Sequence, residues 1–164
     1  MTLTSSEALW FLPFATPIVL WAAYTDLKYM KILNVTAGAL ALVFLIVGLI
    51  ALPFDTYLWR LLHLVVVLVI GFLLNLVRLI GGGDAKLMAA IAPFVALPDA
   101  LRFIFMLAGI LIVAFILHRI GSRIGFVRRA TPDWKSWDHL AFPMGTALAG
   151  ALITYLTTAI MSGI

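Results

Sequence analysis

Two aspartates stand out in this sequence because each lies where an apolar stretch meets a short polar one. Asp84 follows three glycines and precedes Lys86, and Asp26 ends the first apolar run of the chain. Two carboxylates brought together share one proton, since like charges a few ångströms apart do not both ionise. The ionised partner takes a proton from water, and the neutral partner donates one to a peptide carbonyl. Such a pair predicts peptide hydrolysis without a metal, a thiol or a serine.

Both aspartates also have structural interpretations. At a helix N-terminus, Asp84 would accept backbone N–H bonds and favour the helix dipole. Asp26 lies near the end of a helix, where a negative charge is disfavoured by up to ~1 kcal/mol. An ion pair with Lys28 or Lys31 would offset this by only ~0–1 kcal/mol. Glu7, Asp55 and Asp99 are expected to be solvated acids in loops or the N-terminal tail. Asp138 is expected to cap the last helix.

The glycines Gly81, Gly82 and Gly83 cost backbone entropy and add no side-chain packing. They let another backbone approach closely, which suits an extended substrate strand beside an acid. Lys86 would tune the acid, bind substrate or extend its amine to the membrane surface. A plain linker remains an alternative. A phosphate-binding loop is disfavoured because the Gly-Lys-Ser/Thr ending is missing.

Composition sets the environment in which these residues must work. Of 164 residues, 65% are hydrophobic and 11% are charged, and the mean hydropathy is +1.17. We interpret the chain as an integral membrane protein with one compact domain. The absence of cysteine excludes disulfides, zinc–thiolate sites and thiol nucleophiles. The scattered charge of +4 is expected to report orientation rather than nucleic-acid binding, and no metal site or cofactor is expected.

Six uncharged runs are each expected to form a membrane-spanning helix, because open strands leave backbone groups unpaired in lipid. They are Ala8–Thr25, Val35–Phe54, Leu61–Val77, Leu87–Leu97, Phe103–Leu117 and Leu140–Ile164. The fourth run is short. If this run crosses the membrane, nine of the eleven Lys and Arg residues fall on one side, and only Arg60 and Arg102 fall on the other. Loops rich in Lys and Arg usually stay in the cytoplasm, so the side with nine is expected to be cytoplasmic. The prediction is an all-α protein with six spans, both termini outside, and the loops near Asp26 and Asp84 in the cytoplasm.

Three stretches carry a family resemblance. GGGDAKLMAA at 81–90 resembles the Gly-x-Gly-Asp-x-Lys-Leu motif of type IV prepilin peptidases, which are membrane aspartic proteases. Asp26 with KILN at 31–34 is similar to that family's earlier acidic motif, with Leu33 where proline is common, and FPMGTALAG at 142–150 resembles its last helix. The resemblance implies that Asp26 and Asp84 are catalytic. It also implies a substrate-binding role for Gly81, Gly82, Gly83, Lys86 and Asn34.

The resemblance further implies a single peptidase domain over 1–164, like the short branch associated with tight-adherence (Flp) pili. Larger members carry a methyltransferase portion and a zinc site, which have no room here. The implied partner is a prepilin or pseudopilin, cut on the cytoplasmic side of the inner membrane, and the oligomeric state stays open. One alternative is a presenilin-like intramembrane aspartyl protease, whose two acids should lie deep within adjacent spans. The other is a non-enzymatic scaffold or transporter of a pilus or secretion machine.

Two smaller expectations concern residues near the same membrane surface. Asn75 is expected to hydrogen-bond between helices, and the alternative is that it positions the two acids. The loop before the last span is expected to contact anionic lipid, with the substrate as the alternative, through Arg123, Arg128, Arg129, Trp134 and Trp137.

Overall fold

The computed structural model describes residues 2–139 and 141–163, and within them the chain is helical and has no strand. The long helices are α1 (Ser5–Tyr29), α2 (Asn34–Ala51), α3 (Phe54–Leu76), α5 (Ala100–Gly121) and α7 (Met144–Ser162). The short ones are α4 (Gly82–Ile91) and α6 (Gly125–Ala130). Single 3₁₀ turns occur at η1 (Ala92–Phe94), η2 (Leu97–Asp99) and η3 (Lys135–Trp137). The predicted all-α architecture is confirmed.

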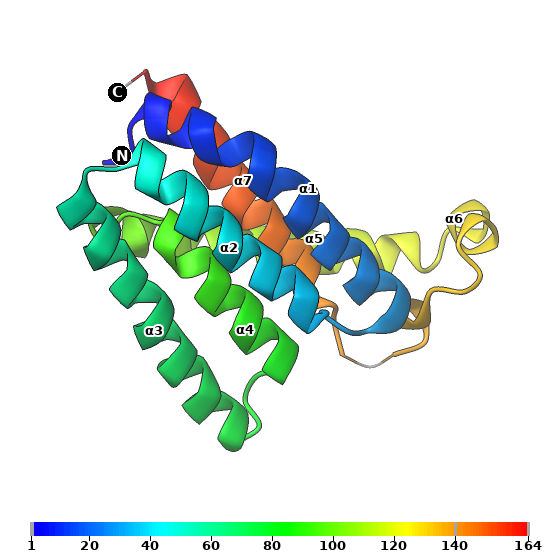
Figure 1. Cartoon of the computed structure of the whole chain (residues 1–164). Helices are drawn as coiled ribbons and strands as arrows, with labels where there is room; N and C mark the ends of the chain where they lie inside the picture. The colour runs from blue at the N-terminus through cyan, green and yellow to red at the C-terminus, as the bar shows by residue number, and fades with distance from the viewer. Residues whose placement is uncertain (1, 140, 164) are drawn as a thin grey trace.

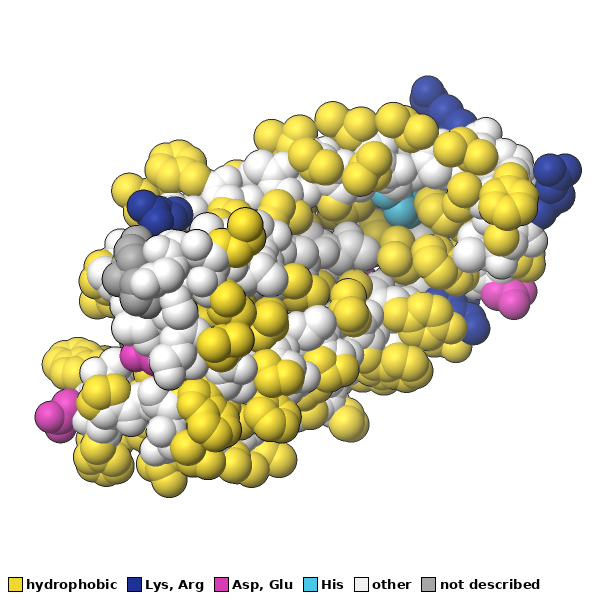
Figure 2. Space-filling view, turned by 90° about the horizontal axis from the view of Figure 1, so that it is seen from above, with side chains coloured by type: hydrophobic (Ala, Val, Ile, Leu, Met, Phe, Trp, Pro, Cys, Tyr) yellow, Lys and Arg dark blue, Asp and Glu magenta, His cyan; other side chains and the backbone are white. Residues whose placement is uncertain are grey.

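Five of these segments are long and apolar enough to cross a membrane, namely α1, α2, α3, α7 and the stretch Leu97–Gly121 that contains α5. Hydrophobic side chains cover the middle of the molecular face in Figure 2, and charged side chains lie towards its ends. The chain is therefore a multi-pass membrane protein. The first and last residues of the predicted sixth span, Leu140 and Ile164, lie outside the described residues.

The fourth predicted span does not form a long helix. At ten residues α4 rises about 15 Å, half of the ~30 Å hydrocarbon layer. The turns η1 and η2 continue it to Asp99, which bonds to Thr2 and Leu3 at the N-terminal end of the bundle. Residues 82–99 thus connect the two ends of the bundle, and the two chain termini lie together at one of them (Figure 1).

Local signals explain where α1 begins and ends. Thr4 and Glu7 form a reciprocal capping box at its start. Met30 ends it in the left-handed conformation with φ 54°, and its N–H donates to the carbonyl of Asp26. This end fixes Asp26 one turn before the chain reverses into α2.

The buried core is formed mainly by α1, α2, α4 and α7, and α3 and η1 complete it at one end. Phe11, Phe44 and Phe94 form a ring cluster with centroid separations of 5.0–5.7 Å, and Tyr57 stacks on Phe44. The most extensive helix pair is α1 with α7. Small buried alanines of both helices let the two backbones approach closely. They include Ala8, Ala15 and Ala22 of α1 and Ala147 and Ala151 of α7. This pairing holds the last turn of α1 against the first turn of α7.

The prediction of solvated acids is wrong for Glu7 and Asp99. The carboxylate of Asp99 is 4% exposed and accepts bonds from Thr2, from the backbone of Leu3 and from the Tyr155 hydroxyl. Glu7 lies 3.4 Å from the buried guanidinium of Arg60. The N-terminus folds over η2 and α7, so acids that resemble loop acids in the sequence become part of a buried polar cluster.

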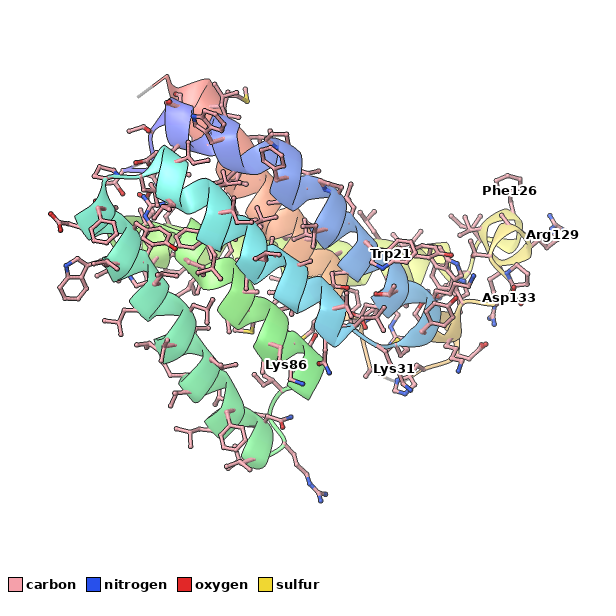
Figure 3. The ribbon with its side chains drawn as sticks, viewed as in Figure 1. Trp21, Lys31, Lys86, Phe126, Arg129 and Asp133 are labelled. Atoms are coloured by element: carbon pink, nitrogen blue, oxygen red, sulfur yellow. The ribbon has the colours of Figure 1, made fainter. Side chains whose placement is uncertain are left out.

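Asp138 also differs from the expectation. It pairs with Arg128 within the loop, whereas α7 begins later, at Met144, behind Pro143 and without a side-chain cap. In Figures 1 and 3, α6 with Phe126 and Arg129 projects away from the bundle.

Candidate active site

Asp26 is held by the start of α7. It lies in the last turn of α1 and is 6% exposed. Its Oδ2 accepts a 2.7 Å hydrogen bond from the backbone N–H of Gly145, in the first turn of α7. A Cβ on residue 145 would lie 3.0 Å from that oxygen and 3.1 Å from the Cβ of Asp26. The approach therefore depends on glycine at 145, and it fixes the direction of the carboxylate.

Asp84 is held by the loop that precedes it. It lies in the first turn of α4 and accepts a hydrogen bond from the backbone N–H of Gly81. A Cβ on Gly81 would lie only 2.6 Å from Asp84 Oδ2, so a larger residue there would displace the carboxylate. The two carboxylates are close enough to interact electrostatically, and both line the same two cavities.

The other two glycines make room for parts of this same chain. A Cβ on Gly83 would lie 3.2 Å from the Cβ of Ile32, in the turn between α1 and α2. Gly82 faces the side chain of Asn75. Asn75 donates to the carbonyl of Ile80 at 2.8 Å, so it closes the turn after α3, and the predicted helix–helix bond is wrong. The glycines thus bring the start of α4 against the end of α1.

Lys86 supports the site from outside the cavities. Its amine donates a 2.8 Å hydrogen bond to Oδ1 of Asn34, which joins the first turns of α4 and α2. Figure 3 shows Lys86 and Lys31 at the same end of the bundle. Of the seven residues predicted for the site, all except Lys86 line the smaller cavity.

The larger cavity has a volume of about 900 Å³ and lies between α1, the turn after α3, α5 and the start of α7. Its walls are largely apolar; they include Leu111, Ile112 and Phe115 of α5, and Phe142 and Met144 before and in α7. The smaller cavity, about 400 Å³, lies between the 30–34 turn and the glycines. Asp26, Asp84 and Gly81 line both, so the acids stand where the two cavities meet.

Two residues beside the larger cavity have left-handed backbones. They are Met30, after α1, and Arg78, after α3, with φ values of 54° and 60°. Non-glycine residues rarely adopt this conformation, and it occurs often at functional sites. Each lies where the chain reverses, and each lines the same cavity as the two acids.

Aromatic side chains hold the loop between α5 and α7 in place. Trp137 stacks on His118 at 4.7 Å and on Trp134 at 5.6 Å, and Trp134 meets Tyr24 of α1 edge-on. The two tryptophans pack against protein and are half-buried, and their expected contact with lipid stays a prediction. Phe142 contacts Phe115 and His118, which places it in the cavity wall.

Sequence reasoning missed several residues of this site. Gly145, Arg78 and Phe142 received no role, although 142–150 carried the resemblance to a last helix. A charged residue at the end of an apolar run, three positions before the glycines, was the available signal for Arg78. No signal pointed to Gly145 as the partner of Asp26, because 119 positions separate them.

The chemistry available here is that of two carboxylates, each of which accepts a hydrogen bond from one backbone N–H. Among the described residues, no group of three or more His, Cys, Asp or Glu side chains could hold a metal ion. Two coupled carboxylates beside a cavity suit general acid–base catalysis.

Residues 14–118 match the family model described as the type IV leader peptidase family. The match includes Asp26, Asn34 and 81–86, and it ends before Gly145. No curated protein matches the chain, and no solved structure does.

Proposed function

We propose that this chain, which belongs to the type IV leader peptidase family, is an aspartic endopeptidase that removes the leader of type IV prepilins. The family makes the chain a leader-peptidase-like protease, and the aspartic mechanism is our proposal. The observation that carries it is that Asp26 and Asp84, from two different helices, line the same two cavities.

In the proposed mechanism the pair holds one proton. The ionised carboxylate takes a proton from water, and the water oxygen attacks the carbonyl carbon of the scissile bond. The neutral carboxylate gives its proton to the carbonyl oxygen. When the tetrahedral intermediate collapses, the C–N bond breaks and the leaving nitrogen takes the proton that the first carboxylate removed from water. The second carboxylate takes a proton from a hydroxyl of the intermediate, so the pair again holds one proton. The pair titrates jointly, so the roles of base and acid belong to the pair rather than to either residue.

The supporting residues have distinct proposed roles. Gly145 aims Asp26, and Gly81 makes room for Asp84. Gly82 and Gly83 set the start of α4 against the 30–34 turn, and an extended substrate would lie along their backbone in the smaller cavity. Asn34 and Lys86 brace this loop through their hydrogen bond. The domain comprises 1–164 as one peptidase unit without a cofactor.

The proposed substrate is a prepilin of the tight-adherence (Flp) type or a related pseudopilin. The proposed location is the inner membrane, with the two acids at the cytoplasmic surface and both termini outside. The distribution of charge supports this orientation, because most Lys and Arg residues lie in the segments at the end of the bundle that holds Asp26 and Asp84. Cleavage on that side would release the leader into the cytoplasm and leave the apolar helix in the bilayer.

Co-expression with a prepilin tests the proposal. Asp26→Asn and Asp84→Asn should each abolish processing, whereas Asp55→Asn, an exposed acid at the other end of the bundle, should not. A chelator should leave cleavage unchanged. Processing that persists in either catalytic-site variant would favour a scaffold or transporter. Loss of activity with the chelator would favour a metal held between the carboxylates.

A further inference from the structure

We propose that the groove between α3 and α5 seats the apolar helix of the substrate, the segment that follows the scissile bond. In this proposal Leu111, Ile112 and Phe115 are the residues of α5 that contact it. The inference rests on the proposed function and adds the path by which a membrane-embedded substrate reaches the carboxylates.

The groove exists because α3 and α5 do not pack together. Within the described residues α3 packs mainly on α4 and η1, α5 packs on α7, and no extended interface joins α3 to α5. None of the most apolar part of the candidate span Leu97–Gly121, which contains α5, is buried, and only a small part of α3 is. The space between them therefore opens sideways into the hydrocarbon layer rather than into water.

One face of α5 supplies the wall of this opening. Leu111, Ile112 and Phe115 are spaced i, i+1 and i+4, so they share a side of the helix, and all three line the larger cavity. Ile112 is 62% exposed and Phe115 is 43% exposed, which leaves them available to a partner. At membrane depth that partner must be apolar, and it must pair its own backbone groups, which a helix does.

The two cavities differ in polarity, and a substrate with an apolar helix on one side of the scissile bond and a leader on the other needs two such different sites. The larger, largely apolar cavity leads from the α3–α5 groove to Asp26 and Asp84. Beyond the acids the smaller cavity continues between the 30–34 turn and the glycines, and it is lined by Lys31 and Asn34. A chain that is helical in the groove and extended past the acids places its apolar part in the first cavity and its leader in the second. The helix after the cut, rather than the leader, is therefore the occupant of the groove.

Cysteine cross-linking tests this placement directly, because the chain contains no cysteine of its own. Single variants Ile112→Cys and Val113→Cys form a matched pair, since the positions are adjacent and are 62% and 56% exposed, but only Ile112 lines the cavity. Each is combined with Asp84→Asn to stop turnover. Each is then oxidised in membranes with a prepilin that carries one cysteine in the first turns of its apolar helix.

We expect the disulfide to form with Ile112→Cys several-fold more than with Val113→Cys. Equal cross-linking at the two positions, or more at Val113, would contradict the proposal that the groove binds the substrate helix, and it would not affect the proposed protease activity. The unsubstituted chain is assayed in parallel. If it does not cleave the prepilin at all, the proposed function fails instead.

A bulky substitution gives an independent readout. Ile112→Trp should lower prepilin cleavage by about tenfold or more by filling the groove, a loss typical of a mismatched apolar pocket. Val113→Trp should cleave at the rate of the unsubstituted chain because its side chain faces away from the cavity. Equal cleavage by the two tryptophan variants, at equal levels of folded protein, would contradict the proposal.

Discussion

Gly145 determines how Asp26 is presented. Its N–H donates at 2.7 Å to the carboxylate, and a Cβ at that position would lie 3.0 Å from the accepting oxygen. The contact joins the end of one helix to the start of another, so neither helix alone would hold the acid in this direction. Each acid of the site lies against the backbone of a glycine, Asp84 against Gly81 and Asp26 against Gly145, where a larger residue would not fit without a shift.

Gly145→Ala is therefore expected to lower the rate of prepilin cleavage by about 10²-fold, since a displacement near 1 Å of a catalytic group has that order of effect. Folding should be little affected, because alanine is favoured in helices. Gly38→Ala is the control, because a Cβ there would meet nothing within 4 Å. The measurement is cleavage rate at matched amounts of folded protein. Equal rates for the two variants would show that the contact does not position Asp26.

At the scale of elements, the end of the bundle that holds both chain termini fixes the helices so that the opposite end can hold the acids. Asp99 at the start of α5 accepts bonds from the N-terminal segment and from Tyr155 of α7, whose hydroxyl also accepts from the N–H of Ala96. Sequence patterns could not predict this cluster, because its bonds join residues 56 to 97 positions apart.

Asp99→Ala should destabilise the protein by about 1–3 kcal/mol or more, because it leaves buried donors unpaired. Asp55→Ala, an exposed acid at the same end, should have an effect near zero. Thermal unfolding in detergent measures both. Cleavage by the fraction that remains folded should be unchanged in each variant. A large loss of activity without loss of stability would show that this cluster takes part in the reaction.

The long helices could be predicted because each is an apolar run of the length that a bilayer requires. The two acids and the glycines could be singled out because their residue types are costly at those positions. The brevity of α4 was visible in its run. What a single sequence could not give were contacts set by tertiary packing, such as Gly145 with Asp26, the tryptophans of the loop against α1 and α5, and Arg78 in the cavity wall.

At the scale of the whole molecule, orientation follows from whether residues 82–99 carry the chain across the bilayer. The absence of cysteine again permits single-cysteine labelling in intact cells. Thr56→Cys and Arg102→Cys should react with a membrane-impermeant thiol reagent, and Arg123→Cys should react only after permeabilisation. If Arg102→Cys is protected in intact cells while Thr56→Cys reacts, α4 does not complete a crossing and the proposed topology is wrong.

The most direct test of the account is the rate of prepilin cleavage by the purified chain in lipid vesicles, with Asp26→Asn, Asp84→Asn and the double variant compared. If the carboxylates act as one unit, each single substitution should lower the rate by about 10³-fold or more, and the double should be no worse than either single. Substantial cleavage by either single variant would contradict the claim that Asp26 and Asp84 together perform the reaction.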